Sequence, residues 1–194
     1  MYKIGITGSI GTGKTTIANM FALFNVPIFD ADQKIKKILR KKEIKQKLKN
    51  IWPLVIKNDH IDKLKLREII FSNDVEKKKL EKLLYPYLGI ELRKFETTNY
   101  NKKILVYDVP LIYETKTQKR YDIILLAHCE REIQRKRVLT RDKISNALFE
   151  KILASQLSFN EKIKFKPLVI NTNFKFLILI KVCFLLLKTL IRLK

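Results

Sequence analysis

The chain contains few of the residues that form disulfide-rich or zinc-stabilised domains. Among its 194 residues there are two cysteines, Cys129 and Cys183, and two histidines, His60 and His128. Their spacing matches no recognised zinc motif. The sequence therefore predicts neutral thiols in a reducing cytosol and a structural histidine at His128.

Acidic residues are also scarce, with 19 Asp and Glu against 41 Lys and Arg, which gives a formal net charge of +22. A basic excess can indicate nucleic acid, an anionic membrane or a polyphosphate ligand. Here the lysines are scattered through every segment beside many isoleucines and asparagines, so the charge is typical of a compositional bias. No nucleic-acid partner is expected.

Since the chain has no repeat and no Gly/Ser linker, residues 1–194 are expected to form a single domain.

Long apolar runs are absent except in residues 174–194, where Lys181 and Lys188 interrupt the run. A membrane span needs about 20 mainly apolar residues without a central charge. We expect an apolar C-terminal helix that packs on the core, and no membrane partner. A tail anchor with Lys181 reaching the interface is the alternative. Because the first expected strand begins at residue 2, no signal peptide is expected, and the predicted location is cytoplasmic.

Glycine is rare as well, with five residues, but three of them fall in the run Gly8-Ser9-Ile10-Gly11-Thr12-Gly13-Lys14-Thr15. This run fits the phosphate-binding loop G-x-x-x-x-G-K-[ST], and it lies between an apolar strand and a helix. Its backbone N–H groups and the helix dipole favour an anion. Lys14 can reach the β- and γ-phosphates of ATP, and the Thr15 hydroxyl can hold Mg²⁺.

Strand-like and helix-like segments alternate along the rest of the chain, which favours an α/β fold with a parallel sheet covered on both faces. Segments 2–6, 26–29, 103–107, 121–127 and 168–170 are the expected strands. The expected helices are 17–23, 33–50, 62–71, 75–84, 87–96, 130–139 and 145–157. Asp74 is expected to cap the helix at 75–84, and Pro86 is expected to end it.

Carboxylates follow two of the expected strands, at the sheet edge where active residues collect. Asp30 and Asp32 come after the second strand and Asp108 after the third. Asp32 can accept or orient the proton of a substrate hydroxyl, and Asp30 can hold substrate or metal. Asp108 is expected to bind Mg²⁺. The structural alternatives are a helix-capping aspartate at 30–32 and a turn-forming aspartate before Val109-Pro110.

Arg137 and Arg141 lie four residues apart on one expected helix face, beside Gln134, Arg135 and Asp142. Two neighbouring guanidinium groups favour an anion between them, and arginine binds phosphate oxygens through two N–H groups. These arginines are therefore candidates for the ATP phosphates. A solvated basic helix is the alternative.

Taken together, these motifs resemble those of the dephospho-CoA kinase family over residues 4–171. The glycine loop resembles I-G-L-T-G-G-I-G-S-G-K-S-T, and residues 28–32 resemble V-I-D-A-D. Residues 108–114, D-V-P-L-I-Y-E, resemble D-V-P-L-L-F-E. Residues 134–142 fit Q-x-x-R-x-x-x-R-D, and residues 154–162 fit A-x-Q-x-x-x-x-x-K.

The resemblance implies a P-loop NTPase three-layer α/β/α sandwich with a mostly parallel five-stranded sheet. It implies a helical part for the CoA precursor at about 32–100 and a lid at about 137–162. The activity it implies is transfer of the ATP γ-phosphate to the ribose 3′-hydroxyl of dephospho-CoA, with Mg²⁺, in a monomer or weak homo-oligomer. The implied residues fall into four groups: catalytic Asp32, Lys14 and Arg141; ATP-binding Gly11, Thr12, Gly13, Lys14, Thr15, Thr16, Arg137 and Arg141; substrate-binding Thr7, Asp30, Asp32, Tyr85 and Leu111; metal-binding Thr15 and Asp108.

Several positions depart from the family pattern. Tyr85 stands where the family usually has histidine, and Lys63 replaces an arginine. Pro167, Asn171 and Thr172 replace two aspartates and an asparagine. The alternatives are another small-molecule P-loop kinase and a nucleic-acid-binding P-loop ATPase, which polynucleotide would stimulate.

Overall fold

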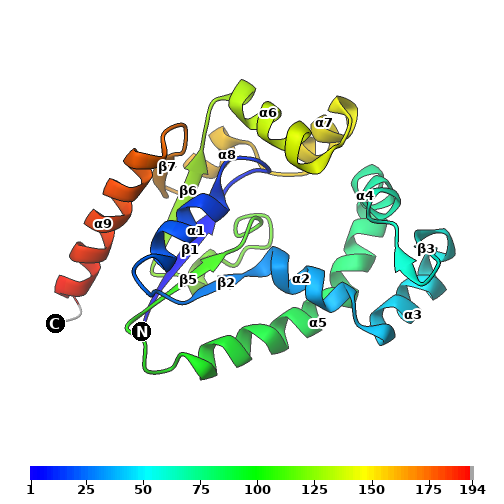
Figure 1. Ribbon diagram of the computed structural model, residues 1–194, viewed down its shortest axis with the longest axis horizontal. Helices are drawn as coiled ribbons and strands as arrows, with labels where there is room; N and C mark the ends of the chain where they lie inside the picture. Colours follow the sequence, from blue (N-terminus) through cyan, green and yellow to red (C-terminus); the bar gives the residue numbers. More distant parts are fainter. Residues whose placement is uncertain (193–194) are drawn as a thin grey trace. The chain divides into compact units, whose positions relative to one another are not determined.

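A parallel five-stranded sheet in the order β2-β5-β1-β6-β7 forms the centre of the larger unit (Figure 1). The computed structural model describes residues 1–192. The sheet strands are β1 Tyr2–Thr7, β2 Ile28–Asp30, β5 Ile104–Asp108, β6 Ile123–His128 and β7 Leu168–Asn171. All four neighbouring pairs are parallel, and the chain between the two strands of each pair contains α-helices. The predicted α/β three-layer fold class is confirmed.

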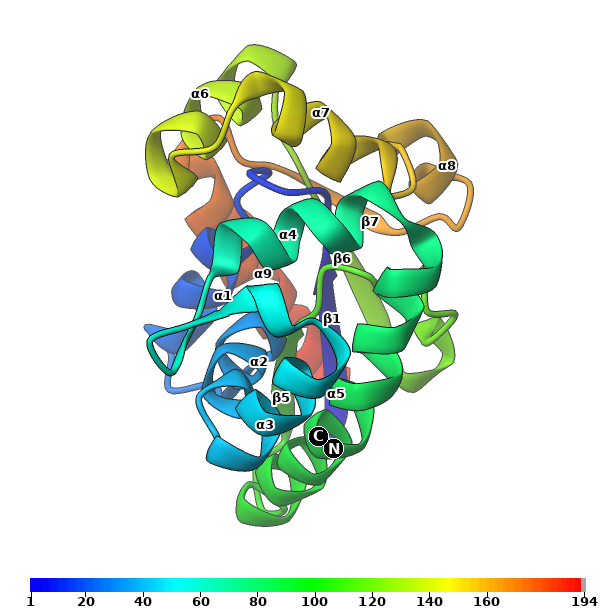
Figure 2. The same cartoon turned by 90° about the vertical axis from the view of Figure 1, so that its right-hand side faces the viewer.

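Residues 1–30 and 98–194 form this larger unit, unit 1, and residues 31–97 form unit 2. The helices of unit 1 are α1 Lys14–Ala22, α6 Arg131–Asp142, α7 Asn146–Ala154, α8 Phe159–Ile163 and α9 Lys175–Arg192, with a short 3₁₀ turn at Gln118–Arg120. Figures 1 and 2 show α6 and α7 side by side above the loop that joins β1 to α1.

The core of unit 1 lies between the sheet and the pair α1 and α9. Ile4, Ile6 and Val106 point to this face and pack with Phe21 and Val182. The strands are almost wholly apolar because both sheet faces are covered, as expected for parallel strands. Ile112 and Tyr121, from the connection between β5 and β6, lie against the opposite face at Gly5.

The C-terminal apolar segment forms α9, and one of its faces packs on α1 and β7. Ile178, Val182, Leu185 and Leu186 are buried there. This is the closing helix expected from the sequence. Among residues 1–192, the chain has no helix with the length and apolar character needed to cross a membrane.

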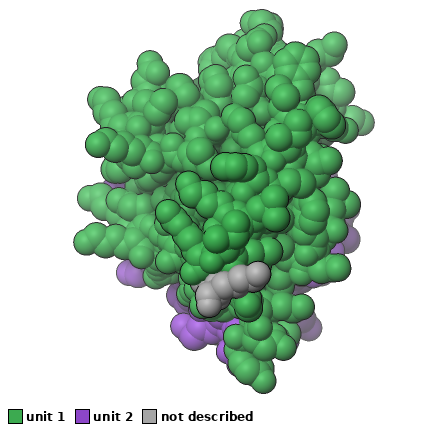
Figure 3. Space-filling model, turned by 90° about the vertical axis from the view of Figure 1, so that its left-hand side faces the viewer, with its two compact units in different colours: residues 1–30, 98–194 green, residues 31–97 purple. Residues whose placement is uncertain are grey.

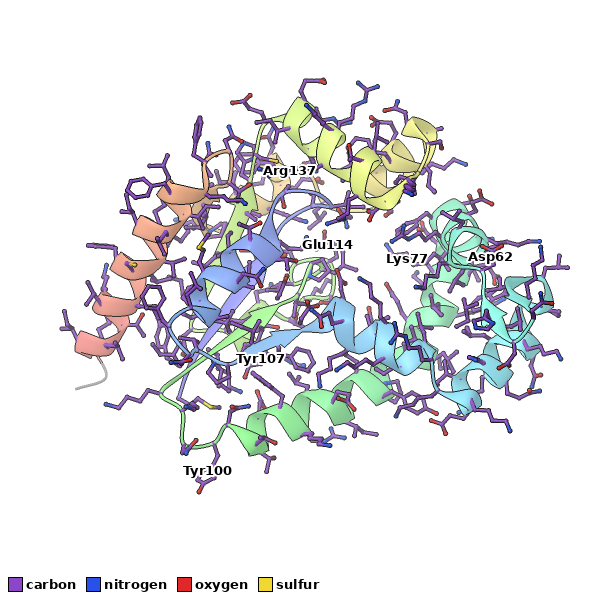
Figure 4. All side chains as sticks on the ribbon, viewed as in Figure 1. Asp62, Lys77, Tyr100, Tyr107, Glu114 and Arg137 are labelled. Atoms are coloured by element: carbon purple, nitrogen blue, oxygen red, sulfur yellow. The ribbon has the colours of Figure 1, made fainter. Side chains whose placement is uncertain are left out.

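Unit 2 consists of helices around a second apolar core. It contains α2 Ala31–Leu39, α3 Lys42–Ile51, a 3₁₀ turn Pro53–Val55, the hairpin β3 Ile56–Lys57 and β4 His60–Ile61, α4 Lys63–Ser72 and α5 Asp74–Thr98. Its core includes Ile38, Leu48, Trp52 and Leu84. Asp62, labelled in Figure 4, caps α4 by accepting the Lys65 N–H at 3.0 Å.

Three local predictions in unit 2 are wrong. The expected helix 33–50 is divided into α2 and α3, and the short hairpin was not expected. Asn73, not Asp74, caps α5: its side-chain oxygen accepts the Val75 N–H at 2.9 Å, and Asp74 is already helical. Pro86 lies inside α5 instead of ending it.

The apolar core explains why α5 continues through Pro86. Proline removes one helical N–H and crowds the preceding turn, which normally breaks a helix. Leu80 and Leu84 are buried before Pro86, and Tyr87 and Leu88 pack on the same core after it. Because both halves of α5 are held by one core, packing offsets the lost hydrogen bond.

Candidate active site

The glycine-rich loop, residues 8–13, follows β1 and leads directly into α1. Gly11 and Gly13 have φ angles of 77° and 88°, in the region that glycine adopts without strain. A Cβ on Gly11 would collide with Val138 and lie 3.0 Å from the Gln134 carbonyl. The loop therefore needs glycine for its conformation and for its contact with α6. It presents backbone at the positive end of α1, which is the geometry of an anion site.

Lys14, the first residue of α1, folds back over this loop. Its Nζ donates hydrogen bonds to the carbonyl oxygens of Gly8, at 2.9 Å, and Ser9, at 3.2 Å. The ammonium group is thus held above the backbone that would surround a phosphate. A cation therefore lies beside the loop that the sequence predicts to bind phosphate.

Thr15 and Asp108, the two predicted metal ligands, lie next to each other although 93 residues separate them in the chain. The Thr15 hydroxyl donates to Asp108 Oδ2 at 3.2 Å. Asp108 is buried at the end of β5, and Thr15 is exposed on the first turn of α1. A hydroxyl and one carboxylate oxygen, completed by phosphate oxygens and water, fit the oxygen-only preference of Mg²⁺.

The carboxyl ends of neighbouring strands bring Thr7, Asp30 and Asp108 to one edge of the sheet. Asp30 is the register partner of Asp108, which is also paired with Ile6 on β1. Thr7 is fully buried, and its hydroxyl donates to the Pro110 carbonyl at 2.8 Å. Thr7 therefore holds the segment after β5 in place. Leu111, the next residue in that segment, is half-buried.

The two arginines of the second cluster lie in different surroundings. Arg137 on α6, labelled in Figure 4, donates to the Thr172 hydroxyl at 3.2 Å and to the Thr172 carbonyl at 2.9 Å. Arg141 is exposed and makes a bidentate contact with Asp142, at 3.0 and 2.9 Å. The structure thus places Arg137 beside the glycine loop through Thr172, whereas Arg141 lies on the outer part of α6.

Thr172, noted in the sequence only as a departure from the family, connects three parts of the site. Its side chain is buried, and its hydroxyl donates to the Thr12 carbonyl at 2.7 Å. Its backbone N–H donates to the His128 carbonyl at 2.8 Å. Together with Arg137, it ties the glycine loop to β6 and α6. A threonine after the last strand gives no sequence signal for this role.

Two glutamines hold the peptide groups of Ile10, at the tip of the glycine loop. Gln134 Nε2 donates to the Ile10 carbonyl at 2.6 Å, and Gln156 Oε1 accepts the Ile10 N–H at 3.1 Å. Both glutamines belong to the motifs that carried the family resemblance, yet neither was assigned a role. They connect the loop to α6 and to the segment after α7.

Cys129 also contacts the loop, since its thiol lies 3.8 Å from the Gly11 carbonyl and donates to it. Burial raises the pKa of this thiol, and that effect outweighs the neighbouring Arg137. The thiol is therefore neutral, as predicted, and a neutral thiol is a weak nucleophile.

A buried ion pair lies beside the site. Lys162 Nζ on α8 is 2.9 Å from Glu114 Oε1, and the lysine side chain is 1% exposed. The same carboxylate oxygen accepts the Leu157 N–H at 3.0 Å (Figure 4 labels Glu114). Phe165 stacks on Tyr113 at a ring distance of 4.5 Å, along a cavity of about 480 Å³. The ion pair thereby joins the segment after β5 to the end of the predicted lid.

We predict that Lys162→Met lowers the free energy of unfolding by about 3 kcal/mol, because it leaves the Glu114 carboxylate buried without its cation. Lys164→Met is the matched control, since Lys164 is exposed two residues away. Denaturant unfolding measures both variants. Equal unfolding midpoints for Lys162→Met and Lys164→Met would contradict the prediction. Adding Glu114→Leu to Lys162→Met should restore part of the lost free energy of unfolding, because the buried carboxylate is then removed as well.

Two predicted residues, Asp32 and Tyr85, belong to unit 2. Asp32 is exposed on the first turn of α2, two residues beyond Asp30 in the chain. Tyr85 lies on α5 and is 41% exposed. Partial burial, with a smaller contribution from Glu81, raises the pKa of its phenol to about 12. Tyr85 is therefore neutral at physiological pH and cannot supply the cation that a histidine could.

Comparison with known proteins gives one family for almost the whole chain. A family model described as dephospho-CoA kinase matches residues 2–176. The chain is 36% identical to a dephospho-CoA kinase of Fusobacterium nucleatum over 172 residues, which are 88% of this chain and 89% of the relative. A Thermus thermophilus crystal structure, 25% identical, superimposes with a TM-score of 0.83 and covers 96% of both chains. A dephospho-CoA kinase from Campylobacter jejuni, also 25% identical with 96% of both chains covered, gives a TM-score of 0.60.

Proposed function

The chain belongs to the dephospho-CoA kinase family and is an ATP-dependent kinase, and we propose that its acceptor is the ribose 3′-hydroxyl of dephospho-CoA. One observation supports this most strongly: a phosphate-binding loop with Lys14 above it and Thr15 beside Asp108. It lies in a chain that the family model matches over residues 2–176. The products are CoA and ADP.

The loop is proposed to bind the triphosphate of ATP through backbone N–H groups of Gly11, Thr12, Gly13 and Thr16. Lys14 Nζ, now on the loop carbonyls, would turn to the β- and γ-phosphate oxygens. Charge-assisted hydrogen bonds to phosphate are stronger than those to a neutral carbonyl, which favours this exchange. The hydrogen bonds of Gln134 and Gln156 to Ile10 hold the loop backbone in its conformation while Lys14 moves.

Thr15 and Asp108 are proposed to hold Mg²⁺, the hydroxyl directly and the carboxylate through water or directly. The metal held by these two residues would neutralise charge on the phosphoryl group during transfer. The buried position of Asp108 fixes its carboxylate for this purpose.

Asp32 is proposed to take the proton of the acceptor hydroxyl, or to orient it. The hydroxyl oxygen then forms a bond to the γ-phosphorus as the bond to the β-phosphate oxygen breaks, and ADP leaves. A carboxylate on the first turn of α2 is a group that can accept this proton. Thr7, Asp30, Tyr85 and Leu111 are proposed for the acceptor side.

The segment 137–162 is proposed to be the lid that closes over ATP and excludes water. Arg137, which donates to Thr172 beside the loop, is proposed to bind phosphate with little movement. Arg141 would have to exchange Asp142 for phosphate, and its exposed position leaves it room to do so. Arginine at the transferring group stabilises developing charge.

We also propose a cytoplasmic enzyme, monomeric or weakly associated, with no nucleic-acid partner. The basic charge is spread over both units, and unit 2 alone holds many of the lysines on exposed helix faces.

The function is tested by incubating purified protein with ATP, Mg²⁺ and dephospho-CoA and following CoA by mass. Formation of CoA supports the proposal. Nucleoside monophosphates, shikimate and single-stranded DNA serve as alternative acceptors or activators in parallel. If the protein formed no CoA from dephospho-CoA and consumed ATP only when one of these alternative compounds was present, it would catalyse a different reaction.

A further inference from the structure

The outer face of α9 is an apolar surface that the kinase reaction does not use. The family model ends at Lys175–Phe176, where α9 begins. Leu177, Ile180, Phe184, Leu187 and Ile191 are all exposed. Their spacing of three, four, three and four residues places them in one line along the helix, opposite the buried face. We name these five residues the α9 stripe. Figure 3 views the side of unit 1 on which α9 lies.

The stripe is too apolar to be an ordinary solvated helix face. Phe184 is 67% exposed and Ile191 is 71% exposed, and Phe176 and Leu190 are exposed beside them. A surface helix normally carries polar residues opposite its core face, whereas α9 is apolar on both faces. A contiguous apolar surface of this kind marks an interaction site.

Cations follow one edge of the stripe. Lys181 and Lys188 are seven residues apart and Arg192 is four further on, so all three lie on the same side of the helix. All three are exposed, and residues 175–192 contain no acidic side chain. An apolar face with a basic border is the pattern of helices that lie in the plane of an anionic membrane surface. The aliphatic part of a lysine side chain is long enough for its ammonium group to reach the headgroups while the helix lies in the apolar part of the interface.

We propose that α9 docks unit 1 onto an anionic lipid surface, with the α9 stripe in the interface and Lys181, Lys188 and Arg192 at the headgroups. Charge complementarity favours this occupant over a second copy of the chain. A second copy would bring the same basic border and a net charge of +22, without an acid on α9 to pair with it.

The experiment is flotation of the full-length protein with vesicles of phosphatidylcholine alone or mixed with phosphatidylglycerol. We expect binding to the anionic vesicles that weakens with salt. Phe184→Gln/Leu187→Gln should lower vesicle affinity at least about tenfold, because apolar burial is lost. Leu54→Gln/Leu64→Gln is the matched control, since both residues are exposed leucines of unit 2.

Two double Lys→Gln variants distinguish the effect of the basic border of α9 on vesicle binding from the effect of the overall charge. Lys181→Gln/Lys188→Gln should lower affinity roughly 25-fold, at about fivefold for each lysine near the surface. Lys78→Gln/Lys82→Gln removes the same charge from exposed positions on α5 and should have little effect. ATP-dependent activity in solution should be unchanged in the two α9 variants, which separates this proposal from the kinase function.

Three results would overturn the proposal. The first is wild-type protein that stays with the unbound fraction at low salt. The second is vesicle binding that survives Phe184→Gln/Leu187→Gln, which would assign it to the overall charge. The third is a dimer in sedimentation velocity that the same substitution dissociates, which would assign the α9 stripe to a second copy.

Discussion

Lys14→Ala should reduce kcat for CoA formation by at least about 100-fold, the range expected when a cation acting on transition-state charge is removed. Lys14 donates to the Gly8 and Ser9 carbonyls, which water can bind in its absence. The fold should therefore persist. Steady-state kinetics with ATP and dephospho-CoA measure the loss, and the unfolding midpoint measures the fold.

The matched control is Lys49→Ala, which removes an exposed lysine from α3. It should leave kcat within about twofold, as surface changes generally do not alter the site. If Lys14→Ala kept a normal kcat and raised only KM, Lys14 would bind substrate and transition state equally. That result would remove Lys14 from the catalytic group.

Asp32→Asn should lower kcat by roughly two to four orders of magnitude, the usual contribution of a general acid–base group. The amide cannot take the proton of the acceptor hydroxyl, while the ATP site in unit 1 is left unchanged. Affinity for ATP, measured by calorimetry with Mg²⁺, should stay near that of the wild type.

Asp74→Asn is the control for Asp32→Asn. Asp74 is an exposed aspartate on the first turn of α5, as Asp32 is on the first turn of α2. Both substitutions remove one favourable charge from a helix N-terminus, so each should alter stability by less than about 1 kcal/mol. Normal turnover in Asp32→Asn would assign the base to another residue, and equal losses of activity in both variants would indicate a structural effect.

Local sequence was sufficient where one short segment contains the whole signal. The glycines, Lys14 and Thr15 stand in one run, and the backbone conformation that the run needs is available mainly to glycine. The strands could be located because residues such as Ile104, Leu105 and Val106 form continuous apolar runs. Asp62 and Ser145 were placed at helix starts, and each caps its helix.

Predictions were wrong where distant residues decide local structure. Pro86 should end a helix by its own chemistry, yet the core of unit 2 carries α5 through it. The break between α2 and α3 has no strong signal either, because Arg40 and Lys41 are ordinary helix residues. Packing of Ile38, Ile44 and Leu48 on one core sets the two helix directions.

The sequence by itself determined that this chain binds phosphate, that it has a parallel α/β fold and that it belongs with dephospho-CoA kinases. Each of these follows from local patterns and their order. Only the tertiary structure decided that Thr15 meets Asp108, that Thr172 ties Arg137 to the glycine loop, and that Gln134 and Gln156 hold Ile10. These contacts join residues up to 160 positions apart. Their geometry is set by strand register and helix packing, which no local pattern encodes. For the same reason, only the structure could divide α9 into a buried face and an exposed apolar stripe.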